Sequence, residues 1–243
     1  MMRKQTTGLF SRFLLLVAIA GFGFAGCSDD NPSGNDGTGN DKVTVTKPGQ
    51  GSVYEYEEYD TEGGAKVDGS EQDVTMTVVE TGVSYEGKAD VFKVQEEYKS
   101  GEKSDLYVRF ESNNDMTLLF SDEAIDAVES FWITIPFGSG TTQSKVLLNE
   151  VEENGQGGFD TLMLKWETSY VGKETVQYNG SDMEVWVGKI IISGKFPFPP
   201  FGNVELNGVS MVEFAPSLGF IYRTEDESDG EGSVRTLMSH TLK

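Results

Sequence analysis

The chain of 243 residues has little of what most enzyme chemistry uses: it contains one cysteine, Cys27, and one histidine, His240. A single cysteine forms no disulfide within the chain, so a folded domain needs a sufficient hydrophobic core. A zinc site needs three or four ligands, and His240 is the one nitrogen ligand available. No Gly-x-Ser-x-Gly motif is present for that histidine to serve. The sequence therefore predicts no catalytic residues, no metal site of the zinc type and no cofactor.

Positive charge is also scarce, because 19 Lys and Arg residues stand against 40 Asp and Glu residues. Arg3, Lys4 and Arg12 precede the apolar run 13–25, which is too short to span a bilayer and is typical of a secretory signal peptide. Removal of residues 1–26 takes away these three positive charges and no acid, so the net charge changes from −21 to −24. Such a domain repels nucleic acid and anionic headgroups, and we expect no nucleic-acid partner.

The sequence FAGC, from Phe24 to Cys27, follows the apolar run and resembles the lipobox of bacterial lipoproteins, with Phe24 in place of the usual Leu. In that family the cysteine is acylated and the chain is cut before it, so the resemblance implies cleavage after residue 26 and a lipid anchor at Cys27. Stable anchoring takes two or more acyl chains. Ser28 implies sorting to the outer membrane, and CSDD is similar to the export signal of surface lipoproteins in the Bacteroidetes. The periplasmic face and the cell surface both stay open.

The folded domain is expected over 42–243, because residues 27–41 are a polar, glycine-rich stretch that buries no apolar surface and acts as a tether. From residue 42 apolar and polar residues alternate, and Gly, Asn and Asp clusters separate the runs. This pattern predicts about twelve antiparallel strands, each with one buried face. We expect an all-β fold, a curled antiparallel sheet or an open or half barrel. The expected core positions are Val74, Met76, Val78, Phe92, Val94, Tyr98, Leu106, Val108, Phe110, Leu162, Leu164 and Trp166.

One short helix is predicted in SDEAIDAVESFW, with Ser121 as N-cap and Ile125, Val128 and Trp132 as its apolar stripe. An internal repeat is also predicted, over about 51–135 and 159–243. It is indicated by YEGKADVFKV and YNGSDMEVWVGKI, and by two later hairpins whose first strands end at Phe110 and Phe214.

The last thirty or so residues, from VEFAPSLGFIYR onward, resemble the C-terminal part of β-rich bacterial envelope lipoproteins of unassigned function. The matching residues are Ala215, Pro216, Leu218, Gly219, Phe220 and Ile221. In those families the sheet curls into an open or half barrel. The resemblance implies a fold and no substrate.

Two stretches are candidate binding sites. Glu225, Glu227 and Asp229 alternate before a glycine, as in the first half of a calcium loop, but Thr236 stands where the closing acid is expected. The alternative is a solvated acidic turn, which we favour.

The second stretch is KFPFPPFGN, in which Phe196, Phe198 and Phe201 lie on a proline-stiffened segment. These rings either cover the open end of the sheet or face a partner, and we favour the cover.

These observations favour a lipid-anchored, non-catalytic binding or assembly module of the outer membrane or cell surface. Its partners would be the membrane, through the anchor, and an envelope protein or an apolar ligand. A surface carbohydrate-active enzyme with paired carboxylates is an alternative, since 40 acids offer many pairs. A structural envelope component without a ligand is another. A Met-, Trp- and Phe-lined cavity would favour ligand binding, facing carboxyls would favour the enzyme, and a filled core would favour the structural role.

Overall fold

The computed structural model describes residues 44–120, 130–153, 159–197, 203–228 and 230–243. These residues form thirteen strands and contain no helix. The strands are β1 (Val53–Glu62), β2 (Ala65–Lys66), β3 (Gln72–Tyr85), β4 (Lys88–Tyr98), β5 (Lys103–Phe110), β6 (Met116–Phe120), β7 (Phe131–Ile135), β8 (Gln143–Glu153), β9 (Phe159–Tyr178), β10 (Ser181–Pro197), β11 (Asn203–Ala215), β12 (Phe220–Ser228) and β13 (Glu231–Thr241). The expected all-β class is confirmed.

All strands belong to one antiparallel sheet with the order β7-β6-β5-β4-β3-β1-β13-β12-β11-β10-β9-β8, and β2 pairs with β1 beside this path. The order divides into a first meander, β1 with β3–β7, and a second meander, β8–β13. The two meet where β1 and β13 pair, with Tyr54 opposite His240 and Glu58 opposite Arg235. The strands β7 and β8, which are neighbours along the chain, therefore lie at opposite edges of the sheet.

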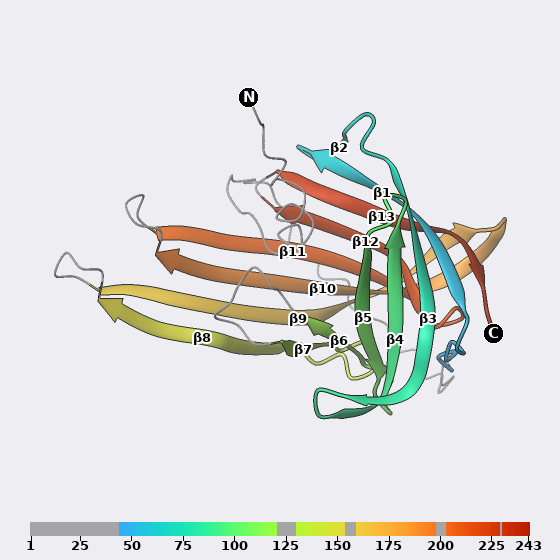
Figure 1. Cartoon of the computed structure of the whole chain (residues 1–243), viewed down its shortest axis with the longest axis horizontal. Coiled ribbons are helices and arrows are strands. Elements are labelled where there is room, and N and C mark those ends of the chain that lie inside the picture. The colour runs from blue at the N-terminus through green and yellow to red at the C-terminus, as the bar shows by residue number, and fades with distance from the viewer. Residues whose placement is uncertain (1–43, 121–129, 154–158, 198–202, 229) are drawn as a thin grey trace, which may run out of the picture.

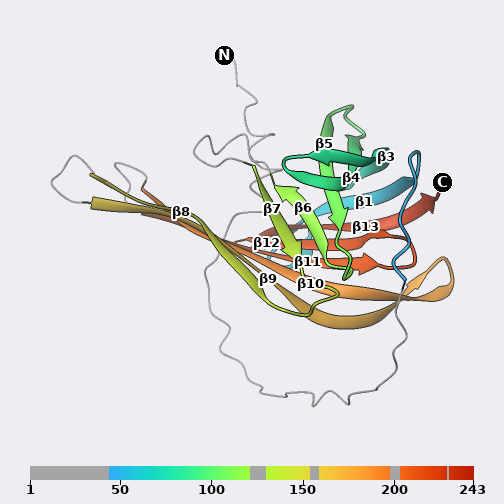
Figure 2. The ribbon, with the colours of Figure 1, turned by 90° about the horizontal axis from the view of Figure 1, so that it is seen from below.

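The sheet curls until its two edges approach each other. In Figure 1, β3–β5 stand upright while β8–β11 lie horizontally, so the two meanders run across one another. Figure 2 shows β6 and β7 lying over β9 and β10. The Thr168 hydroxyl of β9 donates a hydrogen bond of 2.6 Å to the backbone carbonyl of Thr134 in β7. The result is the expected open barrel: a sheet that is nearly closed, with one seam beside β7.

The concave face holds the core, as the period-two pattern predicts. Val74, Met76 and Val78 of β3 are buried, and so are Phe92, Val94, Val108, Phe110, Leu164 and Trp166. Tyr98 and Leu106 are partly buried against the same core. The structure does not describe the side chain of Leu162. The alternation thus identifies the inward face of most strands.

The predicted helix is wrong at its C-terminal end. Trp132 lies in β7, and its indole nitrogen donates to the backbone carbonyl of Glu86 at 3.0 Å. The sequence FWITI alternates aromatic and β-branched residues, which favours a strand, and Phe131, Ile133 and Ile135 point into the core. Residues 121–129, with Ser121 and the rest of the predicted stripe, lie outside the described residues.

Candidate functional site on the concave face of the sheet

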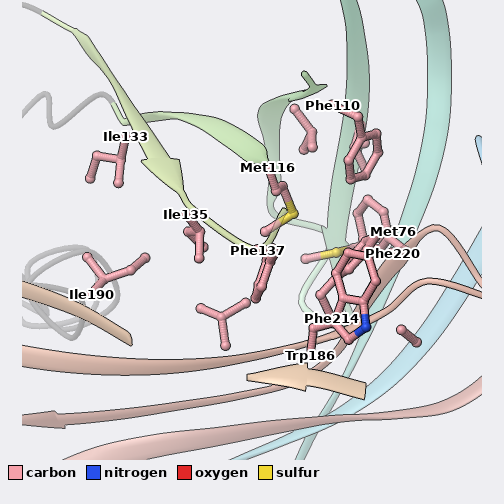
Figure 3. Close-up of a cluster of buried hydrophobic side chains, with 14 of the residues drawn as sticks. Met76, Phe110, Met116, Ile133, Ile135, Phe137, Trp186, Ile190, Phe214 and Phe220 are labelled. Atoms are coloured by element: carbon pink, nitrogen blue, oxygen red, sulfur yellow. The ribbon is translucent and has the colours of Figure 1, made fainter. Parts of the chain in front are cut away.

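Aromatic and methionine side chains fill the centre of the concave face (Figure 3). Phe214 of β11 is fully buried, and its ring centroid lies 5.4 Å from that of Phe110, 5.5 Å from that of Phe137 and 5.9 Å from that of Trp186. Met76 and Met116 close the cluster (Figure 3), and both are buried. Phe110 comes from the first meander and Phe214 from the second. The rings that would line an apolar cavity therefore pack against one another.

The seam beside β7 is tightly packed at Gly188 of β10. A Cβ atom at this position would lie 2.4 Å from Cγ2 of Ile135 and 3.0 Å from a ring carbon of Phe137. Real Cβ atoms do not approach that closely, so a glycine is needed here for the chain that follows β6 to lie against β10. The contact of Ile135 and Phe137 with Gly188 packs the β7 edge of the sheet against β10.

Charged side chains occupy the other end of the concave face. Arg235 of β13 donates from Nε to Glu58 of β1 at 2.7 Å and from Nη1 to Glu96 of β4 at 2.5 Å. Its Nη2 donates to Glu58 and, at 3.1 Å, to the hydroxyl of Tyr98. The side chains of Arg235, Glu58 and Glu96 are 17%, 11% and 12% exposed. The two carboxylates raise the pKa of Arg235 above its ordinary value, although burial acts in the opposite direction.

The remaining oxygens of the two glutamates are also bonded. Gln72 donates to Oε1 of Glu58 at 2.7 Å, and the Ser104 hydroxyl donates to Oε2 of Glu96 at 2.7 Å. All four carboxylate oxygens therefore have donors. A general acid or base must exchange a proton with a substrate, and a carboxylate held by an arginine and a second donor is poorly placed for that step.

Asp226 of β12 lies beside this ionic cluster without a bond to Arg235. Its Oδ1 is buried and has no hydrogen-bond partner, while the Ser210 hydroxyl bonds the same carboxyl. Burial raises the pKa of Asp226 to about 6. Two residues further along β12, Ser228 is buried and its Oγ also lacks a partner. Buried polar atoms are nearly always bonded, so these two atoms mark an incomplete site.

The single histidine lies in a ring cluster at the end of β13. The Tyr178 hydroxyl is 2.7 Å from Nδ1 of His240, and the rings of Tyr178 and Tyr222 meet edge to face. Tyr178 ends β9, so this contact ties the β9–β10 hairpin to the strand that pairs with β1. His240 contacts ring atoms and a hydroxyl, which is typical of a residue with a structural role.

The predicted site residues lie apart from the concave face or outside the description. Cys27 belongs to the part of the chain that is not described, and so do Phe198 and Phe201. Phe196 lies in β10, where its backbone pairs with Val204, and its side chain is outside the description. Lipidation and the fate of these rings therefore stay predictions.

The calcium candidate lies on a strand for most of its length. Glu225 and Glu227 belong to β12, and Arg223 donates to Glu225 at 2.6 Å. Asp229 lies outside the described residues. Across the described ranges no group of three His, Cys, Asp or Glu side chains could hold a metal ion. The candidate remains untested as a whole.

Sequence reasoning missed the ionic cluster, although a signal was present. Glu58 and Glu96 interrupt the apolar faces of their strands, following Tyr54 and Tyr56 in β1 and Val94 in β4. Two acids on inward positions of different strands indicate a shared cation. Nothing in the sequence identifies Arg235 as that cation, because it lies 177 and 139 residues away from them.

Two hollows among the described residues are small. One of about 140 Å³ is lined by residues of β1, β2, β12 and β13 and the adjoining turns, including Lys66, Arg223 and Asp226. Another of about 200 Å³ lies between Asp182–Glu184 and Pro216–Ser217. Ligand pockets usually enclose roughly 300–1,000 Å³. Neither hollow therefore has the size that an acyl chain or a sugar chain would need.

Two solved structures are similar to this chain. One is a protein of Bacteroides fragilis with a YmcC-like fold, inferred to be exported: identity is 14%, coverage is 82% of this chain and 99% of that chain, and the TM-score is 0.41. The other is the hypothetical lipoprotein YmcC of Escherichia coli, with 9% identity, coverage of 75% and 85%, and a TM-score of 0.31. No protein-family model and no curated protein matches the chain. Neither similarity assigns a ligand, an activity or a partner.

The described part of the chain contains no helix with the length and hydropathy of a membrane span.

Proposed function

We propose that this protein is a lipid-anchored envelope lipoprotein, attached to the outer membrane through Cys27, whose β domain assembles with another envelope protein without catalysis. The observation that carries the assembly role is the free edge of the sheet at β8. This strand pairs with β9 through residues 143–153, and no described strand pairs with its other edge. An unpaired strand edge presents backbone donors and acceptors to which an extended segment of another protein adds as a further strand.

The shape of the second meander supports this role. The strands β8–β10 reach well beyond β6 and β7 in both views of the chain (Figures 1 and 2). On the edge strand, Val146 is 52% exposed beside a bulge. A large exposed β-branched residue on a projecting edge is typical of a surface that another chain covers.

The alternatives are less well supported. A carrier of an apolar ligand needs a cavity, and Met76, Phe110, Phe137 and Phe214 fill the centre of the sheet instead. A glycosidase needs two carboxyl groups that face a substrate. Glu58 and Glu96 face Arg235, so the one pair of facing carboxylates described above is already neutralised.

The anchor is tested by Cys27→Ser. The wild-type protein is expected to enter the detergent phase on partitioning, whereas the variant should accumulate as precursor or as water-soluble protein. Labelling with a radioactive fatty acid provides a second readout. A variant that still partitions into detergent would contradict the lipid anchor.

The assembly role is tested by site-specific photo-crosslinking in cells of the native host. A photoreactive residue in place of Val146 should capture one envelope protein, with the crosslink mapping to an extended segment of that partner. The control is the same residue in place of Met238, which is 57% exposed on β13 in the centre of the sheet. Equal capture at both positions, or none at position 146, would contradict an assembly surface at β8.

A further inference from the structure

The β12 polar site is the set formed by Ser210, Asp226 and Ser228. Ser210 of β11 lies directly opposite Asp226 in the register, and Ser228 follows two residues later, on the same face of β12. Ser210 and Ser228 are 4% and 2% exposed. Oδ1 of Asp226 and Oγ of Ser228 are buried without a partner. The site therefore presents oxygen acceptors whose donor is missing.

The surrounding charges define which donor would fit. Arg235 lies close enough to Asp226 to interact electrostatically, but it directs its bonds to Glu58, Glu96 and Tyr98. When Asp226 is ionised, three carboxylates surround one guanidinium. Glu225, the next residue of β12, adds a further negative interaction. The missing donor should therefore carry a positive charge.

We propose that Ser210, Asp226 and Ser228 bind a primary ammonium group, carried either by a small amine or by a lysine side chain of a partner protein. An ammonium has three N–H donors and no acceptor. It would donate to Oδ1 of Asp226 and to the two hydroxyl oxygens, because a serine that donates one bond keeps its acceptor lone pairs. A calcium ion would need six to eight oxygen ligands, more than this site supplies.

The depth of the site favours a small ligand. Asp226 as a residue is partly exposed, whereas Ser210 and Ser228 are buried. The hollow of about 140 Å³ that Glu225 and Glu227 line lies on the other face of β12 and is not part of the site. A site enclosed in this way selects a compact cation over a bulky one.

Ammonium binding would be linked to protons. Burial raises the pKa of Asp226 to about 6, and a bound positive charge would lower it. Below that pKa the free site holds a proton, which the ammonium must displace. Binding should therefore release up to one proton near pH 5 and strengthen as pH rises to 7.

The test uses methylammonium chloride, with potassium chloride at equal ionic strength as the reference, and N-acetyl-lysine methylamide as the lysine arm. Isothermal titration at pH 5 in buffers of different ionisation enthalpy reports the released proton, and thermal melts at pH 7 report binding. Asp226→Asn should weaken methylammonium binding at least tenfold and abolish proton release. Glu227→Gln, the neighbouring acid on the opposite face, should leave both unchanged.

The two arms separate the possible sources of the ammonium. Binding of both ligands supports a lysine of a partner, and binding of methylammonium alone supports a small amine. Three results would overturn the proposal: an equal melting shift with potassium chloride, equal weakening by Glu227→Gln, or no binding of either ligand to the wild type. The Asp226→Asn variant removes a poorly solvated charge and keeps its shape, so failure to fold is not expected to obscure the comparison.

Discussion

The two meanders contain six strands each in the same up-and-down order, yet they differ in strand length. In the first meander the strands shorten to 8, 5 and 5 residues in β5, β6 and β7, whereas β9 and β10 of the second have 20 and 17. The short strands turn inward and end over β9 and β10, and the long strands continue past them (Figure 2). Strand length thus decides which edge of the sheet is packed and which is free.

The hairpins that suggested an internal repeat correspond closely. Tyr85 pairs with Lys88 and Tyr178 pairs with Ser181, each across a two-residue turn with positive φ at both positions. Phe110 and Phe214, which end the later matching strands, are in ring contact at the centre of the core. These correspondences support a duplicated six-stranded unit, which remains a proposal.

The largest expected effect on stability comes from removing Arg235 of the second meander, which forms ion pairs with Glu58 and Glu96 of the first. Arg235→Met leaves Glu58 and Glu96 buried without their cation, which should lower the free energy of unfolding by about 3–5 kcal/mol. Urea unfolding at pH 7 measures this loss. Arg223→Met is the matched control, because Arg223 is 32% exposed and pairs with acids of the second meander alone. It should cost about 1 kcal/mol or less. Equal losses in the two variants would contradict a larger contribution to stability from the buried ion pairs of Arg235.

The next effect depends on pH and concerns Asp226. Its pKa is raised from 3.8 to about 6 by burial, so the folded state binds the proton more tightly than the unfolded state. Stability should therefore fall as pH rises from about 4 to 6, by about 3 kcal/mol from this group. Asp226→Asn removes this dependence: the variant should match the wild type near pH 4 and exceed it at pH 7. Unfolding midpoints at several pH values test this, and a gap independent of pH would contradict it.

The contact between the meanders across the seam is the third target. Gly188→Ala places a methyl group against Ile135 and Phe137, and such overpacking should cost about 1–3 kcal/mol. The same change in an Ile135→Ala background should cost less, because the nearest atom has been removed. Four urea curves complete the cycle. If the losses of stability from Gly188→Ala and Ile135→Ala were strictly additive, a steric contact between these two positions would be contradicted.

The smallest effect concerns the two matching turns. Glu86 has φ of 43° and Asn179 has φ of 51°, and asparagine tolerates this region better than glutamate. Glu86→Asn should raise stability by about 0.5–1 kcal/mol, and Asn179→Glu should lower it by a similar amount. The backbone carbonyl that accepts from Trp132 is kept in the first variant. Changes of the same sign in both hairpins would contradict their equivalence.

Local signals in the sequence predict much of this fold. The alternation in DVTMTVVE places Val74, Met76 and Val78 in the core, where the structure has them. Turn residues such as Asn179 mark the hairpins. The predicted helix is wrong at Trp132 because an apolar spacing of three or four also fits the β-rich run FWITI, which forms β7. A short segment of mixed pattern is decided by its tertiary neighbours, here β6 and the core.

The candidate site needed long-range information. Each member of the ionic cluster sits in an ordinary strand, and the pairing of β1 with β13 brings Glu58 opposite Arg235. No local pattern encodes that pairing. Asp226 and Ser228 stand out in the structure because Oδ1 of one and Oγ of the other lack a partner, and the sequence shows them as part of an acidic stretch. Acidic residues at a strand end normally indicate solvent, so the sequence favoured a solvated turn.

The pairing of β1 with β13 has a consequence for the order of folding. β1 and β13, the first and last strands that the structure describes, lie side by side in the middle of the sheet. A chain that is synthesised from its N-terminus therefore cannot complete the centre of its sheet until the eleven residues of β13 are available. Contacts so distant along the chain form slowly. Until β13 is available, each meander has one unpaired inner edge, and such an edge is a template on which a strand of another chain can pair.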